Sequence, residues 1–371
     1  MAADFPPNAV RLNIPIKRYD TCQPSALTMN DDKAMMQLTE AEYRKRFDGY
    51  IITDCAVLKR GQYYFVSRNI AESERAGPTA EATVTKRVGW YFPFRTQGSR
   101  IQDMDFEGYR TLTIGASRAG EHLILCVSVD GQVTSTDGGE EDNDEDENVI
   151  PKSIRGPRRG AMRRLRTIDD SLYAVGSDHT VCVRRGRNRW ESLCLNLPEP
   201  TLTDFNDVER SDNMAFVDID GFSENDIYVI AGKGRVWHFD GTKWSRIAFP
   251  SDMDVYSICC AGDGYVYIGG QSGSVWRGRN NEWTLLVREM LTLPFEDIVW
   301  HAGKVWLTSD YGLWNVIDGQ LVEADLPSSD IKVCAGNLSV GDGVMLMAGT
   351  HGAAVHDGSV WQLIFHRMQF A

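Results

Sequence analysis

The stretch DIYVIAGKGRVWHFDGTKW, residues 226–244, decides the fold of this 371-residue chain. It contains an apolar run, a Gly turn, a second apolar run, an Asp-Gly turn and a Trp, in that order. Short apolar runs separated by turn residues are typical of β-strands. The stretch by itself therefore predicts three strands joined by tight turns.

The same order of parts recurs on both sides of this stretch. The other copies are SLYAVGSDHTVCVRRGRNRW (171–190), GYVYIGGQSGSVWRGRNNEW (264–283), GKVWLTSDYGLWNVIDGQL (303–321) and GVMLMAGTHGAAVHDGSVW (343–361). The spacing of the second-strand position is 39 residues from Tyr228 to Tyr267, 39 to Trp306 and 40 to Leu346. A period near 40 with about four short strands per copy is the signature of β-propeller blades.

The turns inside the copies support this interpretation. Asp240-Gly241, Asp318-Gly319 and Asp357-Gly358 are each predicted to be two-residue hairpin turns between alternating apolar strands. A Trp follows the turn in most copies, as Trp244 and Trp361 do. We expect this Trp to begin the outermost strand and to fill the wedge to the next blade.

The first half of the chain is less regular. Residues 111–137 contain two strands, an Asp130-Gly131 turn and a third strand, and residues 49–70 resemble the start of another blade. We therefore predict an all-β protein, a β-propeller of seven four-stranded blades, with six or eight blades as the alternatives.

An N-terminal segment precedes the ring. Residues 9–19 could form a strand that closes the ring beside the last blade, since closure removes the unpaired edges of an open array. Thr39 followed by Glu42 resembles a capping box and predicts one short helix. We divide the chain into an N-terminal segment, 1–46, and the propeller, 47–371, with an acidic insertion at 137–148 and a loop insertion at 197–213.

Composition excludes several classes of function. The net charge of −13 argues against a nucleic-acid binder, which needs a basic surface for phosphates. The chain begins without a basic and then apolar leader and has no run approaching eighteen apolar residues, so we expect a cytoplasmic protein that does not bind membranes. The eight cysteines form no CxxC pair, so we expect buried reduced thiols.

The acidic insertion is the first candidate site. It cannot form a core element, because like charges repel, and we expect a solvated loop. Three interpretations stay open: a loop without function, a contact with a basic partner surface, and calcium binding. The EF-hand pattern fails, since Glu147 stands where Gly makes the turn and Ser153 stands where a bidentate Glu is needed.

If the insertions contact a partner, their acidic residues are the candidates. Those of the acidic insertion are Asp137, Glu140, Glu141, Asp142, Asp144, Glu145, Asp146 and Glu147, and those of the loop insertion are Asp204, Asp207 and Glu209. A basic run, residues 151–166, follows the acidic insertion directly. We interpret it as an internal counter-charge whose end enters a blade strand, in preference to a nucleic-acid site.

No motif in the sequence predicts catalysis, a metal site or a cofactor. The seven histidines stand apart without metal-ligand spacing, and no nucleophile elbow or phosphate-binding loop is present. Ser309-Asp310 with Gly312 and Trp314 comes nearest to the Asp box of sialidases but lacks its spacer and precedes a third strand. Propeller enzymes assemble sites from several blades around the axis, so a hydrolase or lyase in the central channel stays an alternative.

The repeat resembles that of a broad group of bacterial propellers, whose blades read roughly DIYAVG, Gly, apolar strand, DG and Trp. The resemblance covers about 171–365. It differs from the eukaryotic WD40 pattern, because the Trp-Asp ending and the Gly-His opening are absent. Cytosolic members of this size are similar to immunity proteins that neutralise toxins delivered by type VI secretion or related contact-dependent systems, which implies a toxin as the partner.

Our hypothesis is a non-catalytic propeller that displays both insertions on one face and blocks the active or DNA-binding cleft of a toxin. A basic toxin, with a nuclease favoured, would complement the acidic insertion, and we expect a monomer that forms a heterodimer with it. The alternatives are the channel enzyme and an assembly scaffold. Several carboxylates and arginines gathered in the channel would favour the enzyme.

Overall fold

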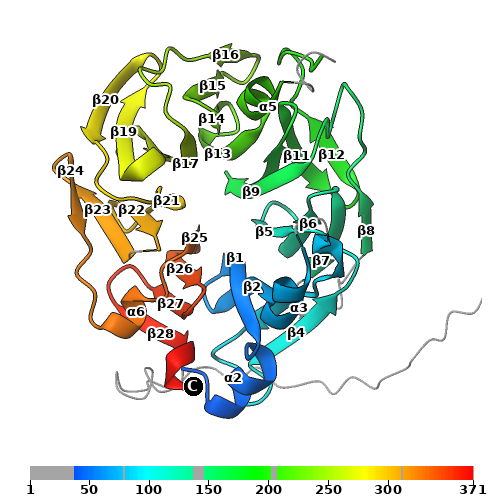
Figure 1. Cartoon of the computed structure of the whole chain (residues 1–371), viewed down its shortest axis with the longest axis vertical. Helices are drawn as coiled ribbons and strands as arrows, with labels where there is room; N and C mark the ends of the chain where they lie inside the picture. Colours follow the sequence, from blue (N-terminus) through cyan, green and yellow to red (C-terminus); the bar gives the residue numbers. More distant parts are fainter. Residues whose placement is uncertain (1–36, 78–79, 137–145, 202–206, 311, 371) are drawn as a thin grey trace, which may run out of the picture.

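The structure is a computed structural model that describes residues 37–77, 80–136, 146–201, 207–310 and 312–370. Within these ranges the chain forms seven sheets of four antiparallel strands, arranged as blades around an axis (Figure 1). The prediction of a seven-bladed propeller is confirmed, and the alternatives of six and eight blades are wrong.

Each blade consists of four strands that are consecutive in the chain, with the first strand at the axis (Figure 1). Blades 1 and 2 comprise β1 (Tyr50–Lys59), β2 (Gln62–Asn69), β3 (Lys86–Tyr91), β4 (Ile101–Phe106), β5 (Leu112–Ser117), β6 (Leu123–Ser128), β7 (Gln132–Thr136) and β8 (Asp146–Val149). Blades 3 and 4 comprise β9 (Met162–Ile168), β10 (Ser171–Gly176), β11 (Thr180–Gly186), β12 (Arg189–Ser192), β13 (Phe216–Ser223), β14 (Asp226–Ala231), β15 (Arg235–Phe239) and β16 (Trp244–Arg246).

The remaining blades continue the same order. Blades 5 to 7 comprise β17 (Val255–Cys260), β18 (Val266–Gly270), β19 (Ser274–Arg279), β20 (Glu282–Val287), β21 (Asp297–His301), β22 (Lys304–Ser309), β23 (Gly312–Ile317), β24 (Gln320–Glu323), β25 (Asn337–Gly341), β26 (Val344–Gly349), β27 (Gly352–His356) and β28 (Trp361–His366). Short helices lie in the connections and flanks: α2 (Glu40–Arg46), α3 (Ile70–Arg75), α5 (Val208–Met214), α6 (Ser329–Lys332), and the 3-10 turns η1 (Glu81–Thr83), η2 (Gln271–Gly273) and η3 (Arg367–Gln369).

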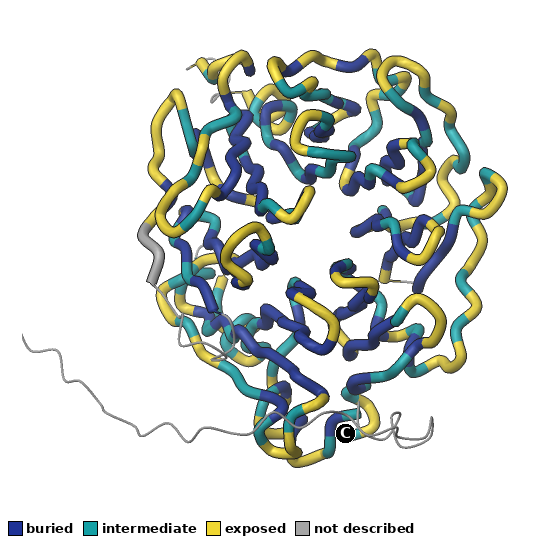
Figure 2. Tube along the Cα trace, turned by 180° about the vertical axis from the view of Figure 1, so that it is seen from behind, coloured by how far each residue is buried: buried dark blue, intermediate teal, exposed yellow. Residues whose placement is uncertain are grey.

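The core lies between the blades. The buried apolar side chains form seven clusters, and each cluster joins the facing sides of two neighbouring blades. Figure 2 shows this burial concentrated in the inner strands, with exposed residues in the connections. Strands that are buried on both faces explain why their sequences are continuous apolar runs.

Trp244 and Trp361 begin their fourth strands and are buried as predicted, whereas Trp190 and Trp283 are partly buried, and the wedge that is filled differs from the prediction. Trp244 packs in the cluster that contains Tyr173 and Val175 of blade 3, and its indole donates to the carbonyl oxygen of Leu193 at 2.8 Å. Trp361 likewise packs with Trp306 of blade 6. The wedge that these residues fill is therefore the one to the preceding blade, because the Trp lies on the sheet face that packs there.

Only one of the three Asp-Gly pairs forms the predicted two-residue turn. Asp318 and Gly319 join β23 to β24 directly, and both have the positive φ angles of such a turn, 51° and 76°. At the other two pairs the connection has four residues, 240–243 and 357–360. There the Asp carboxylate accepts hydrogen bonds from the backbone N–H groups two and three residues later, which stabilises a longer turn.

The ring closes through packing and the helix α2, and each terminal blade completes its own sheet. Phe47, which caps α2, stacks on Phe365 of blade 7 at 4.4 Å and contacts Phe65 of blade 1 edge to face. The backbone N–H of Leu38 donates to the carbonyl oxygen of Ile364 at 2.8 Å. The proposed closing strand at 9–19 lies outside the described residues.

The capping box is confirmed. Glu42 and Thr39 exchange the expected hydrogen bonds, and Glu42 also forms a buried ion pair with Arg100 of blade 1 at 2.7 Å. Burial alone would raise the pKa of Glu42, but Arg100 and the backbone N–H donors lower it to about 2. The carboxylate that starts the helix therefore also fixes it to the ring.

Two insertions differ from the predicted loops. The last residues of the acidic insertion form β8, which pairs with β7, so this part is an edge strand and not a loop. A solvated edge strand tolerates charge because its outer side faces water. The loop insertion at 197–213 contains most of α5, which Asp207 caps by accepting from the backbone N–H of Arg210.

Candidate functional site

The first strands present aspartates at matching positions beside the axis. Asp54, Asp218 and Asp297 lie on β1, β13 and β21, each directly before a buried residue. In each case one carboxylate oxygen accepts from the N–H of the following residue, at 2.9 to 3.0 Å. The other oxygen accepts a backbone N–H from the first strand of the next blade.

The hydrogen bonds from the next blade follow the same pattern at all three aspartates. Asp54 accepts from Ile114, Asp218 from Ile258 and Asp297 from Leu338, each at 3.0 Å. A buried backbone N–H without a partner costs free energy, so each aspartate satisfies a donor that the next blade cannot satisfy within its own sheet. Three of the seven inter-blade joints are held in this way.

Blade 3 carries arginines in place of the aspartate. Arg164 precedes the buried Leu165 on β9, and Arg166 lies two residues further on the same face. Arg166 donates to both oxygens of Asp218 at 3.0 Å and also to Asp297. Arg164 donates to Asp297 at 2.6 Å. We call these four residues, Arg164, Arg166, Asp218 and Asp297, the axial ion cluster.

The axial ion cluster is balanced and largely removed from water. Asp218 and Asp297 are 1% exposed, whereas the arginine side chains are 14% to 17% exposed. Burial alone would raise the pKa of Asp297, but Arg164 and Arg166 together hold it below its ordinary value. Two cations and two anions cancel, so the cluster offers no net charge to a substrate.

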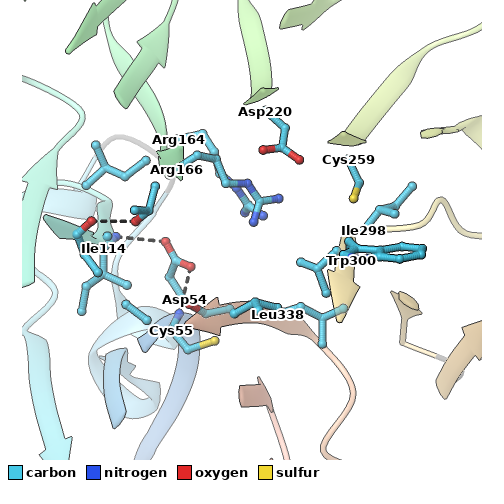
Figure 3. Close-up of a pocket in the computed structure, with 18 of the residues that line it drawn as sticks. Asp54, Cys55, Ile114, Arg164, Arg166, Asp220, Cys259, Ile298, Trp300 and Leu338 are labelled. Carbon is cyan, nitrogen blue, oxygen red and sulfur yellow. Dashed lines mark hydrogen bonds between the residues drawn. The ribbon is translucent and has the colours of Figure 1, made fainter. Parts of the chain in front are cut away.

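A cavity of about 290 Å³ lies beside the cluster, and Asp54, Asp220 and Trp300 are among the residues that line it. Figure 3 shows the side chains of Arg164 and Arg166 extending into it from β9. Burial raises the pKa of Asp54, and it raises the pKa of Asp220 to about 6. Among the described residues neither carboxylate forms an ion pair.

Asp220 repeats the joint that the other aspartates make. Its two oxygens accept from the N–H groups of Gly221 at 2.9 Å and of Cys260, on blade 5, at 2.7 Å. The channel therefore does gather carboxylates and arginines, the observation that would favour an enzyme. Because the carboxylates accept backbone N–H groups and the arginines are paired with aspartates, the arrangement joins blades.

Sequence reasoning missed this cluster. It assigned the basic run 151–166 as the counter-charge of the acidic insertion, but Arg164 and Arg166 pair with aspartates 52 to 133 residues away. The prediction that the run ends in a blade strand is confirmed by β9. The sequence did contain one signal of the cluster. Asp218 and Asp297 each precede an apolar residue, and they lie 79 residues, or two blades, apart.

Among the residues that the structure describes, the histidines and cysteines show no reactive grouping. His301 and His356 approach to 2.9 Å between blades 6 and 7, buried against Trp306 and Trp361. The described cysteines are free thiols, of which only Cys260 is not fully buried. Within the described ranges no three His, Cys, Asp or Glu residues are placed to hold a metal ion. No helix there is long and apolar enough to span a membrane.

Most of the predicted partner-binding residues have no described side chain. Asp137, Glu140, Glu141, Asp142, Asp144, Glu145 and Asp204 lie outside the described residues, and Asp146 and Glu147 are described only as backbone of β8. Asp207 caps α5 and lies 3.5 Å from Arg210. Glu209 is exposed and lies 4.0 Å from Lys233.

The topology separates the two insertions, and the hypothesis that one face displays both is wrong. The acidic insertion joins the third and fourth strands of blade 2, whereas the loop insertion joins the fourth strand of blade 3 to the first strand of blade 4. Strands alternate in direction, so these two kinds of connection leave the ring on opposite faces.

Comparison with known proteins gives one sequence relative and a shared fold. No family model matches the chain. Over 206 residues, 56% of the chain, the sequence is 29% identical to Immune protein Tsi7 of Pseudomonas aeruginosa. The match spans 65% of the length of that relative, slightly less than two thirds.

Among solved structures, similar ones are other propellers. The WD40 β-propeller domain of Doa1 has a TM-score of 0.52 at 13% identity, over 82% of this chain and 95% of that one. YCF48 from Cyanidioschyzon merolae has a TM-score of 0.55 at 11% identity, over 83% and 95%. At these identities the likeness shows the fold alone.

Proposed function

We propose that this chain is an immunity protein, which binds a toxin protein and blocks it without catalysing a reaction. The observation that carries the proposal is the match to Immune protein Tsi7, because it extends through 206 residues, several blades of the ring. A propeller suits this role, since its rigid strands present long connections at both faces.

The axial ion cluster supports a binding role over a channel enzyme. A substrate bound to Arg164 or Arg166 would compete with the buried aspartates, which depend on these arginines as their ion-pair partners. A substrate that used Asp220 would compete with the N–H of Cys260 at 2.7 Å. Both replacements would loosen the joints between blades.

The acidic insertion suggests the chemistry of the partner. Asp137, Glu140, Glu141, Asp142, Asp144, Glu145, Asp146 and Glu147 supply eight of the 52 acidic residues within eleven positions. A dense row of carboxylates resembles a phosphate backbone in charge and speeds association with a basic cleft. We therefore propose a nuclease toxin, held as a heterodimer, with the cleft blocked by charge and by bulk.

The loop insertion is the weaker of the two contacts. Asp207 already caps α5, and Glu209 already faces Lys233, so both have partners within the chain. Since the insertions leave opposite faces, a compact toxin domain that covers the acidic face would not reach Asp204, Asp207 and Glu209. A cytoplasmic site of action and delivery of the toxin by type VI secretion complete the proposal.

Growth of cells that express the toxin tests this proposal. The candidate toxin is the product of a gene beside the one for this chain, expressed from an inducible promoter with and without the chain. We expect the chain to restore growth and to co-purify with the toxin. Continued killing, with folded chain present and no complex formed, would contradict the proposal.

A further inference from the structure

A second pocket lies between blades 3 and 4, where residues of α5, β15 and β16 meet His179 from the connection of β10 to β11. Its volume is about 260 Å³. The residues that line it are His179, Arg210, Asn213, Met214, Arg235, Trp237 and Arg246. A neighbouring hollow of about 570 Å³ shares Arg235 and Arg246, so the two spaces meet at these arginines. Glu209, Lys233 and Asp252 are the other charged residues that line this hollow.

The strand register places the key side chains on one face. Arg235 and Trp237 are two residues apart on β15, and Arg246 on β16 is the cross-strand partner of Trp237. Alternate residues of a strand, and residues directly opposite on the neighbouring strand, share a face. β16 has only three residues, so Arg246 stands at the end of the fourth strand.

The pocket is basic on an acidic protein. Three arginines and a histidine line it, and no Asp or Glu does, although the whole chain has a net charge of −13. Arg210 lies 3.5 Å from Asp207. Within the described residues neither Arg235 nor Arg246 forms an ion pair or a side-chain hydrogen bond.

The two arginines oppose each other electrostatically. Partial removal from water lowers the pKa of Arg246, and the charge of Arg235 lowers it further. Like charges on neighbouring positions of a sheet face are unfavourable unless an anion lies between them. A group with two or more anionic oxygens would relieve the repulsion and match the planar guanidinium donors.

The remaining walls suit a small group. Trp237 is half-buried, and its ring stands edge to face against that of His179, which is itself buried, at 5.7 Å. The side chain of Asn213 is held in place because its carbonyl oxygen accepts from the N–H of Lys233 at 3.2 Å. The contact with His179 fixes the ring of Trp237, and the hydrogen bond from Lys233 fixes Asn213, so both walls are in place without a ligand.

We propose that this pocket binds an oxyanion, a carboxylate or phosphate group, between Arg235 and Arg246 with Trp237 as its wall. The oxyanion is either free in solution or carried by an acidic side chain of the protein partner. Its site is separate from the acidic insertion, and the first test below does not depend on the proposed function.

The first test measures binding of inorganic phosphate to the full chain. Thermal unfolding is followed as phosphate replaces chloride at constant ionic strength, for the chain and for Arg235→Gln, Arg246→Gln and Arg288→Gln. Arg288 is an exposed arginine on blade 5 and controls for the loss of one charge. We expect a saturable rise in Tm for the chain and for Arg288→Gln, and a rise at least severalfold smaller for the two pocket variants.

The second test identifies the source of the oxyanion, and this arm rests on the proposed function. Affinity for the toxin is measured for the same variants with and without phosphate. A tenfold or greater loss in both pocket variants, with competition by phosphate, assigns the site to an acidic side chain of the toxin. Unchanged affinity assigns it to a free anion, provided that phosphate binds in the first test.

The proposal is overturned if phosphate produces no saturable shift and the pocket variants bind the toxin as the chain does. It is also overturned if phosphate stabilises all four proteins equally, since binding would then lie elsewhere. If the unmodified chain binds phosphate but does not bind the toxin, that result contradicts the immunity function and leaves the oxyanion site supported.

Discussion

Single aspartates at the axis hold the blades together. Their burial strengthens their hydrogen bonds and ion pairs, and it makes an unpaired charge at the same place costly in free energy. Asp297 joins three elements: it accepts the N–H of Leu338 from blade 7 and pairs with Arg164 and Arg166 from blade 3. A buried charge is tolerated only when it is paired and hydrogen-bonded. The ion pairs across the axis therefore depend on one another, and removal of one member leaves the others unpaired.

Replacement of Asp297 tests this dependence. Asp297→Asn keeps an acceptor for Leu338 but leaves Arg164 and Arg166 with a single aspartate, so we expect a loss of roughly 3–5 kcal/mol in the free energy of unfolding. Urea unfolding measures it. Asp105→Asn, which removes an exposed partner of Arg87, should cost less than about 1 kcal/mol. Equal, small effects of the two variants would contradict the account.

The buried pair of His301 and His356 makes stability depend on pH. Burial, and then the neighbouring His356, lower the pKa of His301 to about 4, below its ordinary value of 6.5. The unfolded chain therefore takes up the proton first as the pH falls. The contribution of this group is complete above pH 6.5 and is lost progressively toward pH 4, by on the order of 2–3 kcal/mol.

Asp220 acts in the opposite direction, since its pKa of about 6 lies above the ordinary 3.8 and the folded chain is the first to protonate it. The comparison that isolates the histidine is therefore the difference between the chain and His301→Asn. We expect the two stability curves to converge as the pH falls from about 6.5 to 4. Parallel curves from denaturant unfolding across this range would show that His301 does not titrate as stated.

At the scale of elements, the sequence predicted strands better than connections. The repeat near 40 residues located the blades because each strand is buried between neighbours and reads as an apolar run. Asp240-Gly241 and Asp357-Gly358 were assigned the wrong turn, since the side-chain hydrogen bonds that lengthen the turn depend on geometry beyond the pair. β8 was missed because a run of carboxylates carries no apolar signal, yet an edge strand needs none.

The axial ion cluster could not be predicted for a related reason. Arg166 and Asp297 are 131 residues apart, and only closure of the ring brings blades 3 and 6 across one axis. The placement of Arg235 and Arg246 on one sheet face of blade 4 is equally a property of the fold. Individual blades can thus be predicted from one sequence, whereas sites built from several blades cannot.

The acidic insertion can be tested as an element. Glu140→Gln, Glu141→Gln, Asp142→Asn, Asp144→Asn and Glu145→Gln together remove five charges and leave β8 intact. We expect the rate of association with the toxin to fall roughly tenfold at low salt and to depend less on ionic strength. Stopped-flow mixing over a range of salt concentrations measures both.

A matched control removes five exposed acidic residues outside both insertions: Glu74→Gln, Glu107→Gln, Glu282→Gln, Glu289→Gln and Asp325→Asn. The control should keep the association rate of the unmodified chain to within about twofold, because charges outside the contact are screened beyond about 10 Å. If both variants associate at the unmodified rate, the acidic insertion is a solvated segment and the contact lies elsewhere.

For the whole molecule, a closed ring divides its surface into two faces with different chemistry. The ends of β7 and β8 that flank the acidic insertion lie at one face, and the pocket with Arg235 and Arg246 lies beside α5, which belongs to a connection of the other face. α2 and its contact between Phe47 and Phe365 tie the last blade to the first, so both faces are held rigidly. A rigid ring with a balanced axis suits a protein that blocks another protein by contact.

Titration of toxin activity with the purified chain shows whether the chain blocks the toxin by binding it. Residual activity of the toxin is measured at fixed toxin concentration while the molar ratio of the folded chain is raised. We expect activity to fall linearly and to be abolished near one chain per toxin, with a 1:1 complex on size exclusion. Full toxin activity at a large excess of folded chain would contradict it.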